Sequence, residues 1–194
     1  MNYSIILFDI DGVMITEQYQ FSNGLKRDYG IELEKMLPFF NGNFRDCGIG
    51  KRDLKEELAK VIQDWGWKGT VDELVEYWLT TGTGLDPNMI QFVKSLREQG
   101  TRVYSLTDQE KYRGEHLRKV LKRDVFEEVF FSAELGMRKK EIGTFEFTYR
   151  AIGEPEKGSV LFVDDTQANL DTAKEFGIDT HLFKNLETLK EFLG

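Results

Sequence analysis

Six side chains that can carry out chemistry follow short apolar runs in this chain. They are Asp9 and Asp11 after the first run, Thr107 after the second, Lys139 after the third and its loop, and Asp164 and Asp165 after the fourth. In an open α/β sheet, the residues just beyond the carboxyl ends of parallel strands meet in one crevice, where ligands bind. We therefore expect these six side chains to form one site.

The four aspartates indicate a divalent cation. Asp9 and Asp11 lie two residues apart, so on an extended strand their side chains point to the same side. Their repulsion, added to that of Asp164 and Asp165, is unfavourable unless a hard cation or protonation relieves it. Ligands that offer only oxygen atoms favour Mg²⁺. The sequence thus predicts a Mg²⁺ site made of these four residues.

Carboxylates beside such a cation are suited to chemistry at phosphorus. One carboxylate can attack the phosphorus atom of a phosphate ester while another serves first as general acid and then as general base. A phosphate dianion repels an approaching carboxylate, so the site also needs fixed positive charge and hydrogen-bond donors. We expect Lys139 and the Thr107 hydroxyl to supply them.

The elements that position these residues alternate between strands and helices. Short apolar runs predict strands at residues 4–10, 102–106, 129–131, 160–163 and 180–183. Helical periodicity predicts helices at residues 88–98, 112–122, 143–152, 167–176 and 186–193. This alternation predicts an α/β fold with a doubly wound parallel sheet and right-handed crossovers.

One interval is too long to be a crossover. Between the first two predicted strands, apolar residues recur at helical spacing, and Trp65, Trp67 and Trp78 all fall there. We predict an inserted α-helical cap at residues 14–84, an α/β core at residues 1–13 and 85–194, and tryptophans buried within the cap.

Substrate choice in this arrangement would fall to the cap, which closes over the core and excludes water. The cap offers aromatic faces, an amide and cations at Phe39, Phe40, Asn41, Phe44, Arg45 and Lys51. These side chains either meet a sugar phosphate or another organic phosphate, or they fill the core of the cap and its solvated surface.

The composition limits the classes of binding partner and the cellular compartment that we expect for this protein. The 194 residues include 26 basic and 34 acidic side chains, a net charge of −8, which argues against nucleic-acid binding. A basic stretch at residues 111–123 is expected to be a solvated helix end. No apolar stretch reaches the roughly 18 residues of a membrane span. The single cysteine, Cys47, excludes an internal disulfide, so we expect a soluble cytoplasmic protein whose oligomeric state the sequence leaves open.

The segment IILFDIDGV, which contains Asp9 and Asp11, resembles the first motif of the haloacid dehalogenase-like (HAD) superfamily. Leu106 and Thr107 resemble its second motif, SAELGMRKKEIGTF its third and FVDDTQANLDTAKEFGI its fourth. The resemblance extends from residue 4 to about residue 183, and the insertion follows the first motif, as the helical cap does in this superfamily. The third and fourth segments look most similar to sugar-phosphate phosphatases, such as glucose-1-phosphate phosphatases, and to the N-terminal phosphatases of epoxide hydrolases.

This resemblance implies roles for individual residues. Asp9 would form an aspartyl-phosphate intermediate, and Asp11 would protonate the leaving oxygen and then activate water. Mg²⁺ would be held by the Asp9 carboxylate, the Asp11 backbone carbonyl and Asp165, with Asp164 as a weaker ligand or a supporting residue. Asp9, Asp11, Thr107 and Lys139 would be the catalytic residues of a Mg²⁺-dependent phosphatase acting on a small phosphorylated metabolite.

Two positions depart from the pattern of the superfamily. Asp108 replaces the usual asparagine and adds negative charge near the phosphate, whereas Lys140 replaces the usual proline and adds a second lysine. These departures leave two alternatives open: a weakly catalytic or non-catalytic phosphate-binding sensor or interaction module, and a phosphosugar mutase. A response-regulator receiver has a different order of acidic residues and no helical insertion.

Overall fold

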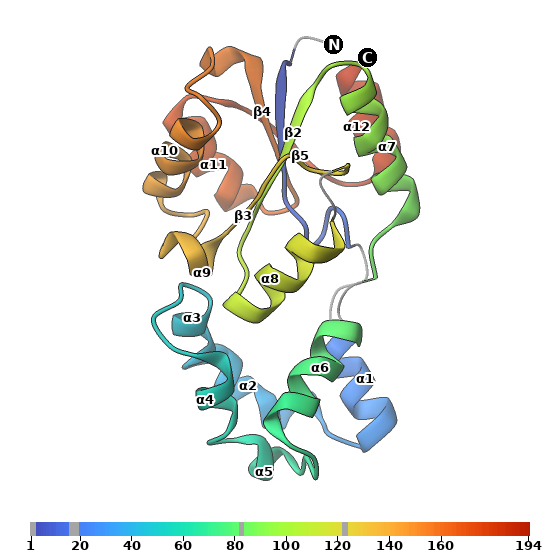
Figure 1. Ribbon diagram of the computed structural model, residues 1–194, viewed down its shortest axis with the longest axis vertical. Coiled ribbons are helices and arrows are strands. Elements are labelled where there is room, and N and C mark those ends of the chain that lie inside the picture. The colour runs from blue at the N-terminus through green and yellow to red at the C-terminus, as the bar shows by residue number, and fades with distance from the viewer. Residues whose placement is uncertain (1–2, 16–19, 82–83, 122–123) are drawn as a thin grey trace.

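A computed structural model describes residues 3–15, 20–81, 84–121 and 124–194 of the chain (Figure 1). A sheet flanked by helices forms one end, and a group of helices inserted after the first strand forms the other (Figure 1). Residue 122, where one predicted helix ends, lies outside the described residues, as do residues 16–19 and 82–83 within the predicted cap.

The sheet is parallel throughout the described residues. Its strands are β1 (Ile5–Phe8), β2 (Arg102–Thr107), β3 (Val129–Phe131), β4 (Val160–Asp164) and β5 (Asp179–Leu182). They lie in the order β3-β2-β1-β4-β5, so β1 is central and pairs with both β2 and β4. The chain crosses from one half of the sheet to the other after β3, which brings the carboxyl ends of β1, β2 and β4 together.

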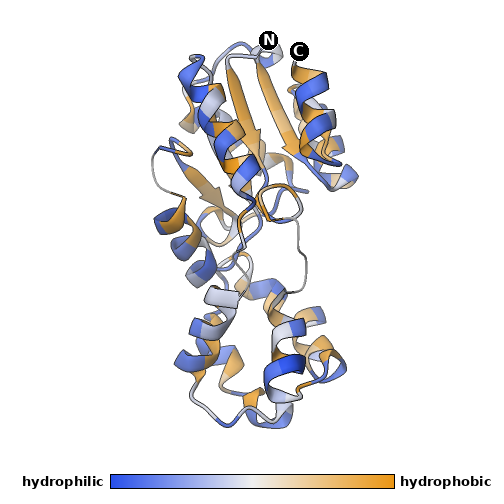
Figure 2. Cartoon of the chain, turned by 90° about the vertical axis from the view of Figure 1, so that its right-hand side faces the viewer, coloured by the Kyte–Doolittle hydropathy of each residue, from blue (hydrophilic) through white to orange (hydrophobic). Residues whose placement is uncertain are grey.

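Helices cover both faces of the sheet, as the predicted doubly wound fold requires. These helices are α7 (Pro87–Glu98), α8 (Lys111–Val120), α9 (Ser132–Leu135), α10 (Ile142–Ala151), α11 (Gln167–Phe176) and α12 (Leu186–Leu193). Alternate strand residues point to opposite faces, so Ile6 and Phe8 pack in the cluster with α7 and α12, whereas Ile5 and Leu7 pack with α10 and α11. Figure 2 shows the apolar strands between helices whose outer surfaces are hydrophilic.

The strand ends differ from the predictions by one or two residues. The first strand was expected at residues 4–10 but ends at Phe8, because the chain turns there and the Ile15 N–H donates to the Ile10 carbonyl over 2.9 Å. The second strand extends to Thr107 and the fourth to Asp164. Asp9 and Asp11 are therefore not on an extended strand.

The insertion has its own hydrophobic cluster. Its described helices are α1 (Gln20–Tyr29), α2 (Leu33–Asn41), α3 (Phe44–Cys47), α4 (Leu54–Leu58), α5 (Ile62–Trp65) and α6 (Val71–Thr81). Trp65, Trp67 and Trp78 are buried in this cluster, which confirms their expected position. Met14 and Ile15, at the start of the predicted cap, pack in the cluster of the sheet.

The described helices also address the membrane prediction. None of them combines the length and the apolar composition that a membrane span needs.

The Cys47 thiol is free and buried in the helical insertion.

Candidate active site

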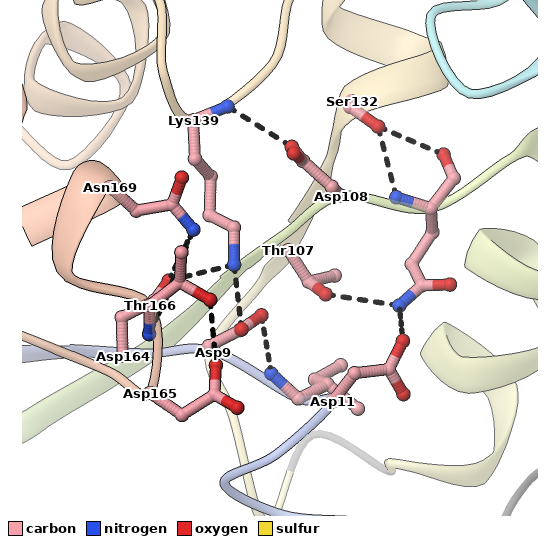
Figure 3. A network of polar contacts seen from close by, with 12 residues as sticks. Asp9, Asp11, Thr107, Asp108, Ser132, Lys139, Asp164, Asp165, Thr166 and Asn169 are labelled. Carbon is pink, nitrogen blue, oxygen red and sulfur yellow. Dashed lines mark hydrogen bonds and ion pairs between the residues drawn. The ribbon is translucent and has the colours of Figure 1, made fainter. Parts of the chain in front are cut away.

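Three neighbouring strands position side chains of the candidate site at their carboxyl ends. Asp9 follows β1, Thr107 is the last residue of β2, and Asp164 is the last residue of β4. Lys139 reaches the same place from the loop between α9 and α10 (Figure 3). All four side chains are buried, although every one is polar.

Lys139 joins the two acidic segments. Its Nζ lies 2.6 Å from Asp9 Oδ2 and 2.7 Å from Asp164 Oδ2 (Figure 3). Burial lowers the pKa of Lys139, but the nearby carboxylates of Asp9, Asp164 and Asp108 outweigh burial and hold that pKa above its usual range. The ammonium group therefore stays charged and partly neutralises the acidic cluster.

Asp9 is the least favourably placed of the carboxylates. Burial raises the pKa of Asp9 above its ordinary value, and Lys139 only partly opposes that shift. The Asp9 Oδ1 atom accepts a hydrogen bond from the Ile10 N–H over 2.8 Å. A cation bound beside Asp9 would favour its charged form further.

The side chains present fit a hard divalent cation. Carboxylate oxygens of Asp9, Asp164 and Asp165 lie within 4.8 Å of one another. The Asp164 carboxylate already accepts hydrogen bonds from the Thr166 N–H at 2.7 Å and from Asn169 Nδ2 at 3.2 Å, besides its ion pair with Lys139. These donors fix the position of the Asp164 carboxylate, and Asp165 as the direct ligand stays a prediction.

Gly12 controls the position of Asp165. Its φ is +82°, and a Cβ atom at this residue would overlap the Asp165 carboxylate. We expect Gly12→Ala to displace Asp165 and to weaken Mg²⁺ activation by about tenfold or more, because supporting residues of metal sites have effects of this size. Activity measured against Mg²⁺ concentration checks this prediction. Gly100→Ala is the matched control, because Gly100 also has positive φ but has open space around its Cβ position.

Asp11 differs most from the sequence-based expectation. Its carboxylate is not in the acidic cluster but forms two short contacts with Arg113, at 2.6 Å and 2.7 Å. Gln109 Nε2 also donates to Asp11 Oδ2 over 2.8 Å (Figure 3). Burial favours a higher pKa for Asp11, but hydrogen bonds and charge from Arg113 outweigh it, so the pKa of Asp11 lies below its usual value. The negative charge of Asp11 is thus balanced by the guanidinium group of Arg113.

Sequence reasoning missed Arg113, which it assigned to a solvated basic helix. Arg113 is only 9% exposed, and it lies four residues before the buried Leu117 on α8. The spacing of Arg113, Leu117 and Leu121 was a usable signal, because residues four apart share one helix face. Lys122 and Arg123, at the end of the same basic stretch, lie outside the described residues.

Thr107 and Asp108 hold neighbouring loops. Gln109 Nε2 donates to Thr107 Oγ1 over 3.1 Å, so one amide group connects Thr107 and Asp11 (Figure 3). The Asp108 Oδ1 atom accepts a hydrogen bond from the Lys139 backbone N–H over 3.0 Å. Burial raises the pKa of Asp108 above its ordinary value, although Lys139 opposes that shift.

Lys140 is exposed and lies outside the cavity described below. The second lysine that the sequence places beside Lys139 therefore does not enter the site. The reason is the loop before α10, where Lys139 is buried between two aspartates while the next side chain faces solvent.

A cavity of about 940 Å³ lies between the sheet and the helical insertion. Asp9, Asp11, Thr107, Lys139 and Asp165 line one side of it. The opposite side includes four of the insertion residues singled out in the sequence, Phe40, Asn41, Phe44 and Arg45. Phe39 is buried in the cluster of the insertion instead, and Lys51 is exposed and not part of the cavity.

Comparison with known proteins identifies relatives of this chain. A model of the haloacid dehalogenase-like hydrolase family matches residues 3–177. A sesquiterpene phosphatase, astK, from Aspergillus oryzae is 31% identical over 108 residues, which is 55% of this chain and 55% of that protein. The chain thus matches about half the length of this curated relative.

Solved structures show the same fold. A HAD family enzyme from Bacteroides thetaiotaomicron superposes with a TM-score of 0.80 at 21% identity over 100% of both chains. The same enzyme has been solved in complex with magnesium and inorganic phosphate, with a TM-score of 0.77 at 21% identity, covering 96% of this chain and 98% of that one. A predicted HAD-like family hydrolase from Porphyromonas gingivalis gives a TM-score of 0.77 at 20% identity over 100% of this chain and 98% of that one. These likenesses confirm the predicted α/β fold.

Proposed function

Because the chain belongs to the haloacid dehalogenase-like hydrolase family, we propose that it is a Mg²⁺-dependent phosphatase that cleaves an organic phosphate monoester. The observation that carries this proposal is the cluster of Asp9, Asp164 and Asp165 with Lys139 at the ends of β1 and β4. The phosphatase among the relatives and the magnesium and phosphate bound to a neighbouring structure support it.

Each residue has a role in the proposed reaction. An Asp9 oxygen attacks phosphorus and the ester P–O bond breaks. The leaving oxygen takes a proton from Asp11, which must therefore gain that proton when the substrate binds, because Arg113 favours its charged form in the free protein. Asp11 then takes a proton from the water that attacks the aspartyl-phosphate, which releases inorganic phosphate and restores Asp9. Lys139 and the Thr107 hydroxyl stabilise the charge on the phosphoryl oxygens.

Mg²⁺, held by the Asp9 and Asp165 carboxylates and the Asp11 backbone carbonyl, would neutralise charge between the aspartate and the phosphate. Asp164 supports this arrangement by keeping Lys139 in place. Asp108 accepts a hydrogen bond from the Lys139 backbone N–H, which gives it a structural role; the sensor and the phosphosugar mutase stay the alternatives to a phosphatase. The cytoplasmic location and the domain boundaries remain proposals.

Phosphate release tests the proposal directly. Purified protein is incubated with Mg²⁺ and a panel of sugar phosphates, nucleotides, alkyl phosphates and an aryl phosphate, with and without a chelator. We expect phosphate release that stops when the metal is chelated and returns when Mg²⁺ is added in excess. Absence of release from every ester in the presence of Mg²⁺ would contradict the proposed function.

Arg113 is expected to act through Asp11. Because it holds both oxygens of that carboxylate, Arg113→Met should let Asp11 move and lower kcat/KM by about 10- to 100-fold. In an Asp11→Asn background the same substitution should have almost no further effect, since residues that act as a unit are not additive. Kinetics of both single variants and the double variant check this coupling. Arg118→Met, on the same helix but paired with Glu128 and Glu134, serves as control.

Additive losses in this cycle would mean that Arg113 acts independently of Asp11. An equal loss in Arg118→Met would instead point to a general effect on α8.

A further inference from the structure

The part of the cavity formed by the helical insertion is largely apolar. The apolar side chains from the insertion that line it are Phe21, Leu33, Leu37, Phe40, Phe44 and Trp78. The polar side chains that the insertion contributes are Ser22, Asn41 and Arg45. The chemistry of the cavity therefore changes from the charged strand ends to a hydrocarbon surface opposite them.

Helix α2 places apolar residues on two of its sides. Met36 and Phe39 are buried in the cluster of the insertion, as expected for an amphipathic helix. Leu33 and Leu37 lie one turn apart on another side, line the cavity, and are 37% and 41% exposed. Exposure of two leucine side chains to water is unfavourable, because apolar surface is more stable away from water. This side of α2 is therefore suited to contact an apolar group.

The aromatic part of this surface is held in place. Trp78 stacks on Phe21 with ring centroids 4.4 Å apart, and Phe44 lies 5.5 Å from Trp78 and 5.3 Å from Phe40. Contacts of this kind fix the rings before any ligand arrives, so the surface is preformed.

We propose that the substrate is a phosphate monoester whose alcohol part is a hydrocarbon or an aromatic group, and that it contacts Leu33, Leu37 and the aromatic residues beside them. A sugar would bring several hydroxyl groups to this surface, where few polar side chains can pair with them, and unpaired polar groups are costly to desolvate. The inference rests on the proposed function for the position of the phosphate, beside Asp9 and Lys139.

Binding of phosphonates separates the two proposals, because a C–P bond is not hydrolysed by this chemistry. With Mg²⁺ present, calorimetry should show hexylphosphonate binding at least about tenfold more tightly than methylphosphonate, within the limit of about fourfold per fully buried methylene. Equal affinities, together with phosphate release from esters, would overturn the apolar substrate and leave the phosphatase intact. Tight hexylphosphonate binding without turnover of any ester would overturn only the phosphatase. Binding of neither phosphonate, together with no phosphate release from any ester, would overturn both.

Substitutions on α2 test whether the alcohol part of the substrate contacts this helix. Leu33→Gln and Leu37→Gln keep side-chain size at exposed positions, so both variants should fold. Each should lower kcat/KM for hexyl phosphate by roughly tenfold while changing that for glycerol phosphate less than about twofold. Ile142→Gln is the matched control, because Ile142 is 41% exposed, begins a helix and lies outside the cavity. Equal losses for both esters, or none, would contradict contact between α2 and the alcohol part.

Discussion

Replacing Asp9 by asparagine is expected to lower phosphate release by about 10⁴-fold or more while the protein stays folded. The amide has nearly the same shape as the carboxylate but cannot attack phosphorus, and losses of this size accompany removal of a nucleophile. Lys139 keeps its ion pair with Asp164 in this variant, so no buried charge is left alone. Burial raises the pKa of Asp9, which means that folding favours the neutral form of this side chain, so a neutral amide should be tolerated there.

Phosphate assays and thermal unfolding, run on the same preparation, check both halves of this prediction. Asp179→Asn is the matched control, since Asp179 accepts a surface hydrogen bond from Tyr3 and should tolerate the change at full activity. A folded Asp9→Asn protein with near-normal rates would show that another group is the nucleophile.

Lys139→Met is expected to lower both the free energy of unfolding and activity. The substitution leaves Asp9 and Asp164 buried with no cation between them, and breaking a buried ion pair costs about 3–5 kcal/mol. Phosphate release should fall by about 10²-fold or more, because the charge that faces the phosphoryl oxygens is lost. Mg²⁺ should restore part of the lost stability, since a ligand that binds only the folded state stabilises it.

Denaturant unfolding with and without Mg²⁺ measures these effects. Lys94→Met is the control, because Lys94 also lies 2.7 Å from an aspartate, Asp124, but both side chains are largely exposed. Exposed pairs contribute about 0–1 kcal/mol, so that variant should lose little stability. Equal losses in the two lysine variants would mean that burial of the Lys139 cluster has no special importance.

The sequence supported a close prediction of the sheet. The apolar runs that become β1 to β5 are bounded by polar residues, and these local patterns located each strand to within one or two residues. Asp9, Thr107, Lys139, Asp164 and Asp165 follow from the same information, because strand ends in a parallel sheet meet by geometry.

Other parts of the site depend on contacts distant in the chain. Arg113 lies 102 positions from Asp11, and no local pattern pairs the two. The role of Asp108 depends on the Lys139 backbone, 31 positions away, so charge alone suggested a conflict where the structure has a hydrogen bond. Leu33 and Leu37 were not singled out in the sequence, because only the cavity shows what these side chains face.

The central place of β1 bears on the dynamics of the protein. Its backbone pairs with β2 on one edge and with β4 on the other, so its amides become exposed only when the middle of the sheet opens. Amide hydrogen exchange in Ile6 and Phe8 should therefore follow global unfolding, whereas fraying ends and edge strands exchange through smaller openings. Asp9 is thus attached to one of the slowest-exchanging parts of the molecule, and it keeps its position while the surrounding loops fluctuate.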